Sequence, residues 1–337
     1  MSEHSVLVDG RIVSFARSGQ QAAEGGSAIK LDSGALAAAI TRSASTQTYF
    51  TIKFLVDRPL VDDAYRAYAY FRWVDDYLDE VCEARDERLV FVERQRQLIA
   101  RAYRGEWLGS LTDEERLVVD LVHHDMKPSS GLRAYIDNMM AVMAFDAERR
   151  GQLISGAELE MYTGWLATAV TEALHHFIGH NDPTPHDETR YLAVTAAHIT
   201  HMLRDAVEDV EAGYYNIPQK VFAAQDLSPM DVSSEFYREW VRERVNLARR
   251  YFEVGRANMA RIQNLRRRLA GYAYIARFEV VLDAIEKDAY RLRPDYPERK
   301  SKQAAFKMGW AAFSQAFKPA VRRGMNAPST NGKALRA

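Results

Sequence analysis

The stretch YAYFRWVDDYLDE, residues 68–80, places three aspartates within five positions of a segment that is otherwise largely apolar and aromatic. An α-helix turns once every 3.6 residues, so residues three and four apart share a face. One such stripe contains Tyr68, Arg72, Asp75 and Asp79. Carboxylates one turn apart repel each other unless a cation lies between them, and Mg²⁺ binds through one or two carboxylates plus substrate phosphates. The stripe therefore predicts a metal site, with a solvated acidic face paired to Arg72 as the alternative.

A second acidic stripe lies in HITHMLRDAVEDVEAGYYNIP, residues 198–218. Residues spaced by three, four and four again share one helix face: His198, His201, Asp205 and Asp209. The residues around them are mostly apolar, so this helix is expected to be largely buried. Because burying unpaired charge is costly, these carboxylates are expected to have a partner.

Two such helices facing each other would place four aspartates around one cavity. The four are Asp75, Asp79, Asp205 and Asp209. We expect this cavity to hold two or three Mg²⁺ ions that bind a diphosphate between them. The neighbouring Arg72 and Arg204 would complete the anion site through charge-assisted hydrogen bonds.

Composition indicates a globular protein with a large core. The chain has 337 residues, of which 47% are hydrophobic, and a formal net charge of −1, which gives no indication of nucleic-acid binding. Its single cysteine, Cys82, cannot form an internal disulfide. No run approaches the roughly 20 apolar residues that span a bilayer, and the first residues lack the apolar core of a signal peptide. We therefore expect a cytoplasmic protein.

The order of patterns along the chain predicts an all-α protein. Residues 1–43 are expected to be an irregular leader, and residues 326–337 a disordered basic tail. Between them, residues 44–325 carry apolar residues at spacings of three and four, interrupted by prolines, and predict a single domain of about nine or ten helices without strands.

The C-terminal end is basic and contains aromatic residues. Glu298 is the last acidic residue, and Trp310, Phe313 and Phe317 lie among the lysines and arginines that follow it. Such an end could rest on an anionic inner membrane surface as a peripheral contact. A solvated terminal helix and a loose tail are the alternative.

Other metal chemistries have weaker sequence support. Glu172 and His175 form one ExxH pair, but a di-iron bundle needs a second, and none occurs. His198 and His201 lack the cysteine or HExxH context of a zinc site. The doublet at 124–125, His-Asp, resembles that of metal-dependent phosphohydrolases but has no further ligands at a suitable spacing.

Taken together, these motifs resemble the squalene/phytoene synthase family, whose members join two prenyl diphosphates head to head. The family pattern Y-A-F-C-R-x-x-D-D-x-x-D-E is matched by residues 68–80, and Q-x-x-N-x-x-R-D-x-x-E-D by residues 198–209. The segment STQTYFTIKFL (45–55) resembles the serine- and aromatic-rich segment before the first motif, and AELEMYTGWLATAV (157–170) resembles the middle helix. The similarity extends over most of residues 45–310.

Several positions depart from the family pattern. His198 and His201 replace a glutamine and an asparagine, and the family's G-R-x-Y-x-P turn has Tyr214 and Asn216 at its arginine and tyrosine positions. At glycine positions of the middle helix the chain has Thr168 and Thr171, followed by Glu172. Threonine would narrow a prenyl tunnel, so these changes affect the expected substrate and regiochemistry.

The resemblance implies an isoprenoid (terpenoid) synthase fold, a helical bundle around a central apolar cavity. It implies that Tyr162 and Tyr68 act in catalysis with the four aspartates, and that His201 joins those aspartates as a metal ligand. It also implies a diphosphate site. The residues assigned to that site are Arg72, Arg204, His198, Thr46 and Thr48.

Three functions follow from the resemblance. The first is Mg²⁺-dependent head-to-head condensation of prenyl diphosphates. The second is a class I terpene cyclase, or a prenyltransferase of altered regiochemistry, on the same scaffold. The third is a non-catalytic relative that acts as an assembly or binding protein. Squalene-type members also use NADPH, which no motif of this sequence indicates.

Overall fold

The computed structural model describes residues 5–8, 11–14, 32–180, 182–183, 186–223, 228, 231, 234–300, 309–310, 313–314 and 317. Eleven α-helices lie within these residues. The first six are α1 (Ser33–Ala44), α2 (Thr46–Leu55), α3 (Val61–Asp76), α4 (Arg85–Tyr103), α5 (Asp113–His124) and α6 (Gly131–Arg149). The others are α7 (Gly156–Phe177), α8 (Leu192–Glu211), α9 (Gln219–Ala223), α10 (Glu235–Met259) and α11 (Leu265–Lys287). The all-α prediction is thereby confirmed.

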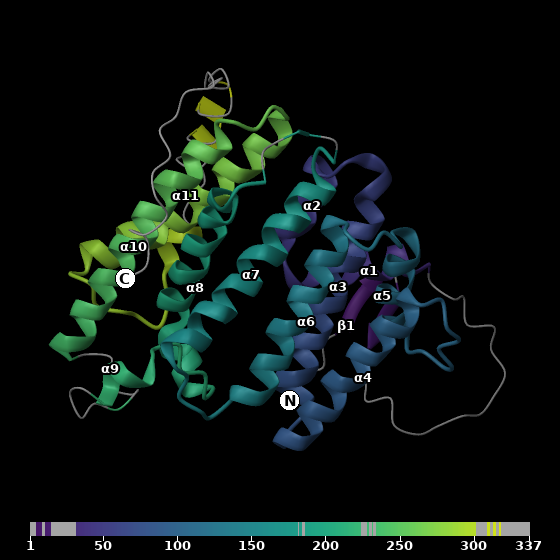
Figure 1. Ribbon diagram of the computed structural model, residues 1–337, viewed down its shortest axis with the longest axis horizontal. Helices are drawn as coiled ribbons and strands as arrows, with labels where there is room; N and C mark the ends of the chain where they lie inside the picture. The colour runs from purple at the N-terminus through teal and green to yellow at the C-terminus, as the bar shows by residue number, and fades with distance from the viewer. Residues whose placement is uncertain are drawn as a thin grey trace.

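The helices form two groups joined by α7 and α8. In Figure 1, α1 to α6 (purple to blue) form one side of the molecule, α10 and α11 (green) form the other, and α7 and α8 lie between them. One apolar core is built mainly from α1 to α7, with the fully buried Tyr70 within it, and a second from α8, α10 and α11, around Phe252. At Gly255 of α10 an added Cβ would lie 2.7 Å from that of Ala193, so the glycine permits the close approach of α8 and α10.

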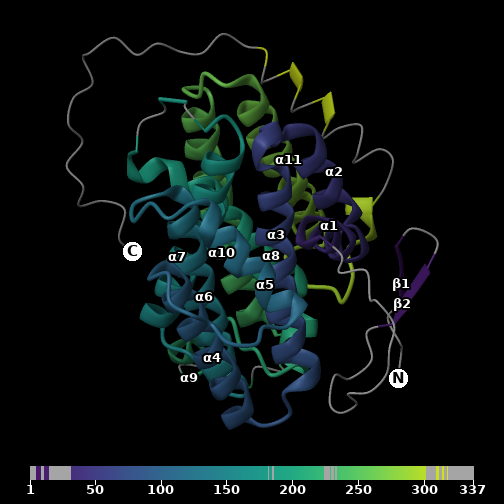
Figure 2. The same cartoon turned by 90° about the vertical axis from the view of Figure 1, so that its right-hand side faces the viewer.

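Helices α7 and α8 run antiparallel, so the bundle has two distinct ends. Ser155 caps the N-terminus of α7 in a capping box with Glu158. Near that terminus Tyr162 faces His198 of α8, whereas Glu172 near the other end pairs with Arg190, just before α8. Both views place α2 and α9 toward opposite ends of the bundle (Figures 1 and 2). The acidic motifs lie at the α9 end.

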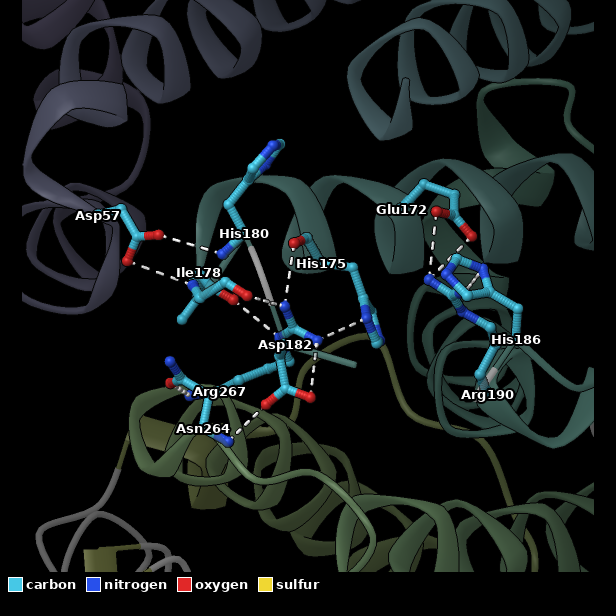
Figure 3. Close-up of polar contacts among 11 residues, drawn as sticks. Asp57, Glu172, His175, Ile178, His180, Asp182, His186, Arg190, Asn264 and Arg267 are labelled. Atoms are coloured by element: carbon cyan, nitrogen blue, oxygen red, sulfur yellow. Dashed lines mark hydrogen bonds and ion pairs between the residues drawn. The ribbon is translucent and has the colours of Figure 1, made fainter. Parts of the chain in front are cut away.

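A network of polar side chains lies at the α2 end of the bundle, and we call it the far-end cluster (Figure 3). Its members are Asp57, Glu172, His175, His180, Asp182, His186, Arg190, Asn264 and Arg267. The buried Arg267 of α11 donates to the carbonyl oxygens of His175, in the last turn of α7, and of Ile178 and Gly179 just after it. Asp57 accepts from the backbone N–H groups of Gly179 and His180 at 3.2 and 3.1 Å. The cluster thus joins α2, α7 and α11.

The N-terminal segment differs from the sequence prediction in two places. Helix α1 begins at Ser33, inside the expected irregular leader, because its alanine-rich sequence favours a helix that packs on α3. A short antiparallel hairpin, β1 (Ser5–Val8) and β2 (Arg11–Ser14), was also not expected. Its short apolar runs flank an Asp-Gly pair in the sequence, which is typical of hairpins.

The structure describes only part of the C-terminal end for which predictions were made. The predicted tail, residues 326–337, lies outside the described residues. Trp310, Phe313 and Phe317 are exposed, at 63%, 54% and 55%. A membrane contact there stays a prediction. Among the described residues no helix is both long enough and apolar enough to span a bilayer.

Candidate active site

The two acidic motifs meet at one cavity of about 260 Å³, which we call the carboxylate cavity. Asp75 comes from the end of α3, and Asp79 from the π-helical turn η2 (Tyr77–Val81) that continues it. Helix α8 contributes four predicted site residues: His198, His201, Asp205 and Asp209. The remaining lining residues are Leu78, Asp146, Arg149, Tyr162, Met202, Tyr214 and Asn216. The two acidic stripes therefore line the same cavity.

Like charges crowd this cavity. Burial raises the pKa of Asp75 to about 7, and the negative charge of Asp79 adds to the rise while Arg72 opposes it. Burial also raises the pKa of Asp209 to about 7, with a further contribution from Asp205 and opposition from Arg149. Each motif thus holds one carboxyl group whose ionised form is disfavoured at neutral pH, and a cation between them would relieve this.

Asp205 differs from its neighbours because two basic side chains contact its carboxylate. Burial raises its pKa, but hydrogen bonds from His201 and Arg204 outweigh burial and bring the net pKa below its usual value. His201 Nε2 lies 2.9 Å from Oδ2 of Asp205, and Arg204 Nε donates to Oδ1 at 2.5 Å. The Nε2 atom of His201, a predicted metal ligand, therefore contacts the carboxylate of Asp205 in this structure.

His198 is buried in the cavity wall without a polar partner. Its side chain is 6% exposed, and neither ring nitrogen has a hydrogen-bond partner among the described residues. Burial lowers its pKa to about 3, so the imidazole is neutral. A neutral imidazole has one donor and one acceptor, and buried polar groups usually find partners. His198 is thus a buried polar side chain in the cavity wall whose hydrogen-bonding capacity is unused by the described residues.

Helix α6 supplies two charged lining residues that sequence reasoning missed. Arg149 Nε donates to Oδ1 of Asp146 at 2.7 Å, and the Tyr162 hydroxyl donates to Oδ2 at 2.9 Å. Neither residue belongs to an acidic stripe. The available signal was an Asp and an Arg three apart at the end of the apolar run MMAVMAF.

The loop after α8 covers the carboxylates from one side. Gly213, at φ +88°, makes the turn, and its carbonyl accepts from Gly151 N at 2.8 Å, which attaches the loop to the α6–α7 connection. The Tyr214 hydroxyl donates to Oδ1 of Asp79 at 2.9 Å. Asn216 donates to Oδ2 of Asp209 at 2.8 Å and accepts from Arg149 at 2.9 Å. The two departures from the family turn therefore contact one aspartate of each motif.

Five predicted site residues do not line the carboxylate cavity. Arg72 pairs with Asp76, through Nε to Oδ2 at 3.0 Å, on a half-exposed face of α3, and Arg204 pairs with Asp205. Tyr68 packs against the first apolar core. Thr46 begins α2, where the Thr48 hydroxyl lies 2.9 Å from that of Ser45. Diphosphate binding and catalysis by these five remain predictions.

The donor set fits Mg²⁺ bound together with a substrate. No group of three or more His, Cys, Asp or Glu among the described residues could hold a metal by itself. Mg²⁺ keeps an octahedral oxygen shell and commonly takes one or two carboxylates plus substrate phosphates. The crowded Asp75 and Asp209, with Asp79 close by, supply such oxygens.

Comparisons with known proteins identify a family through a family model and a fold through solved structures. A family model described as "Squalene/phytoene synthase" matches residues 41–304. The crystal structure of squalene synthase HpnC from Alicyclobacillus acidocaldarius is 18% identical, with a TM-score of 0.60 over 77% of this chain and 95% of that chain. A dehydrosqualene synthase in complex with a ligand is 15% identical, with a TM-score of 0.63 over 84% and 95%. No curated protein matches the chain. At these identities the likeness establishes the fold, and the predicted isoprenoid synthase fold is confirmed.

Proposed function

The chain belongs to the squalene/phytoene synthase family, and we propose that it joins two prenyl diphosphates head to head, with release of diphosphate, in a Mg²⁺-dependent reaction. The observation that carries this proposal is the carboxylate cavity, where Asp75 and Asp209 from two helices both have a pKa raised to about 7. Such crowding costs stability unless a cation is bound, so it is better explained by function than by folding.

The residues that line the cavity would have different roles in binding the metal and the diphosphate. Asp75, Asp79, Asp205 and Asp209 would hold Mg²⁺, which when bound acts as a Lewis acid on the leaving diphosphate. Arg149, the only arginine among the described lining residues, would add positive charge on the diphosphate side.

The allylic cation that remains must be kept from water. In the reaction of the family, this cation bonds to the double bond of the second substrate, and proton loss closes a cyclopropane ring. Tyr162 and the neutral His198 face the same cavity with ring centres 5.2 Å apart, and would stabilise the cation and accept hydrogen bonds. The loop carrying Tyr214 and Asn216 would limit the entry of water.

The test is incubation of the purified protein with Mg²⁺ and, separately, C10, C15 and C20 prenyl diphosphates, with and without NADPH. We expect a C20, C30 or C40 product, according to the substrate accepted, in mass spectra of the extracts. Asp75→Ala should abolish it, whereas Asp86→Ala, on the exposed first turn of α4, should not. No product from any substrate, with a folded protein, would overturn the proposal.

A second candidate is a cyclase or a prenyltransferase of altered regiochemistry. The observation that favours it is Thr171 of α7, which is buried where the family has a glycine and whose hydroxyl has no hydrogen-bond partner among the described residues. The added methyl and hydroxyl groups would narrow and polarise a hydrocarbon cavity. A product with the carbon number of a single substrate would select this alternative.

A further inference from the structure

Asp146 and Arg149 form a buried ion pair beside Tyr162. Their side chains are 19% and 6% exposed, and both residues line the carboxylate cavity. The guanidinium of Arg149 lies 4.8 Å from the centre of the Tyr162 ring, and the ring of Phe145 lies 5.4 Å from it. Tyr162 is thus held at its hydroxyl by Asp146 and at its ring by Arg149 and Phe145.

The ion pair determines what the Tyr162 oxygen can offer to a ligand. A phenol has one hydrogen to donate, together with lone pairs that accept. The hydrogen is directed to Oδ2 of Asp146, because the carboxylate, which pairs with Arg149 through Oδ1, can only accept. Arg149 also hydrogen-bonds the Tyr162 oxygen, so that oxygen has a lone pair and no hydrogen left for the cavity.

We propose that Asp146, held in place by Arg149, is a positioning residue that fixes the Tyr162 hydroxyl as a hydrogen-bond acceptor toward the cavity. The catalytic part of this inference rests on the proposed function, in which Tyr162 contacts the prenyl cation. An oxygen presenting lone pairs stabilises a cation or accepts its proton, whereas one presenting its hydrogen would instead donate to the diphosphate.

The decisive variant is Asp146→Asn, which keeps the shape of the side chain. Arg149 can only donate, so the amide oxygen must face Arg149 and the amide nitrogen must face Tyr162. The hydroxyl hydrogen then turns toward the cavity. We expect kcat to fall about 10- to 100-fold, with KM changed less than about threefold. In a Tyr162→Phe background the same substitution should change kcat less than about twofold, because Asp146 acts through Tyr162.

Asp137→Asn is the matched control, since Asp137 lies on the exposed face of the same helix, and it should leave kcat unchanged. An equal loss of kcat in both backgrounds would overturn the proposal, as would an effect confined to KM. If Asp146→Asn does not fold, Asp146→Glu serves instead, because the longer side chain keeps the charge but displaces the carboxylate oxygens from the Tyr162 hydroxyl. Its loss of kcat should likewise vanish in the Tyr162→Phe background.

A spectroscopic readout separates this inference from the proposed function. The infrared C–O stretching band of Tyr162, identified by its loss in Tyr162→Phe, should shift in Asp146→Asn as the hydroxyl changes from donor to acceptor. An unshifted band would contradict the assigned contact, with or without turnover. A shifted band in a protein that makes no prenyl product would leave the hydroxyl orientation standing while the proposed function fails.

Discussion

The two ends of α7 and α8 bury charged side chains in opposite ways. In the far-end cluster, opposite charges pair: Arg190 Nη2 lies 3.1 Å from Oε1 of Glu172, and the Tyr191 hydroxyl donates to the same carboxylate at 2.8 Å. In the carboxylate cavity, acidic side chains from three helices face one another and only part of their charge is balanced.

This difference separates structure from function. A charge paired with its opposite is explained by folding alone, because removing it leaves a buried partner uncompensated. A cluster of like charges lowers stability, so its presence requires a ligand that compensates it. At one end of α7 and α8 the buried charges are paired and stabilise the fold. At the other end, like charges lie close together and would be stabilised by a bound cation.

The largest effect on stability is expected at the far end. Arg190→Met leaves the carboxylate of Glu172 buried without its guanidinium, and we expect a loss of about 3–5 kcal/mol in the free energy of unfolding. Urea denaturation measures this loss. The double variant Glu172→Gln, Arg190→Met should recover more than half of it, because no buried charge is then left unpaired. A loss below about 1 kcal/mol for the single variant would break the comparison.

Much of the carboxylate cavity could be predicted because helix periodicity is local. The spacing of Asp75 and Asp79, and of His198, His201, Asp205 and Asp209, placed each set on one face, and both sets line the same cavity. The facing of the two sets depends on tertiary packing, and the resemblance to a known family supplied it. The same periodicity predicted the helical region from residue 44 onward, and it missed α1.

Contacts between helices could not be predicted in this way. Asp146 and Arg149 enter the cavity because α6 packs on α7, which no motif in their own helix signals. Arg72 also lies on the predicted stripe, yet its guanidinium hydrogen-bonds Asp76 at i+4 and lies 3.5 Å from Asp75 on the stripe itself. Periodicity fixes the face of a helix from which a side chain emerges, whereas the partner chosen by a long side chain depends on its surroundings.

A smaller and opposite effect on stability is expected at the carboxylate cavity. Asp75 and Asp209 have a pKa raised from 3.8 to about 7, so the folded state binds their protons more tightly than the unfolded state. Without metal, their contribution to stability is therefore fully present below about pH 4 and is lost as the pH rises to about 7. The double variant Asp75→Asn, Asp209→Asn removes this loss. It should be more stable than the wild type at pH 8 by on the order of 1 kcal/mol. This value is set well below what the pKa shifts alone would give, because Asp75 is half-exposed and solvent screens its charge.

Denaturation curves in EDTA at pH 5, 6, 7 and 8 test this expectation. The difference between the double variant and the wild type should grow with pH, because both proteins share the other titrating groups. A difference independent of pH would show that the two carboxyl groups are not crowded. The conclusion that the carboxylate cavity lowers the stability of the metal-free protein would then be wrong.

The smallest effect is expected at Tyr214, whose hydroxyl occupies one oxygen of Asp79. Tyr214→Phe removes one exposed hydrogen bond, at a cost of about 0.5 kcal/mol in stability. Because Asp79 then has both oxygens available to a cation, Mg²⁺-dependent binding of diphosphate should tighten by up to about tenfold. Calorimetric titration measures this, with Tyr215→Phe at the next position as the control. Weaker binding would instead mean that Tyr214 holds Asp79 in its binding orientation, and the cavity would then be preorganised by the loop after α8 rather than obstructed by it.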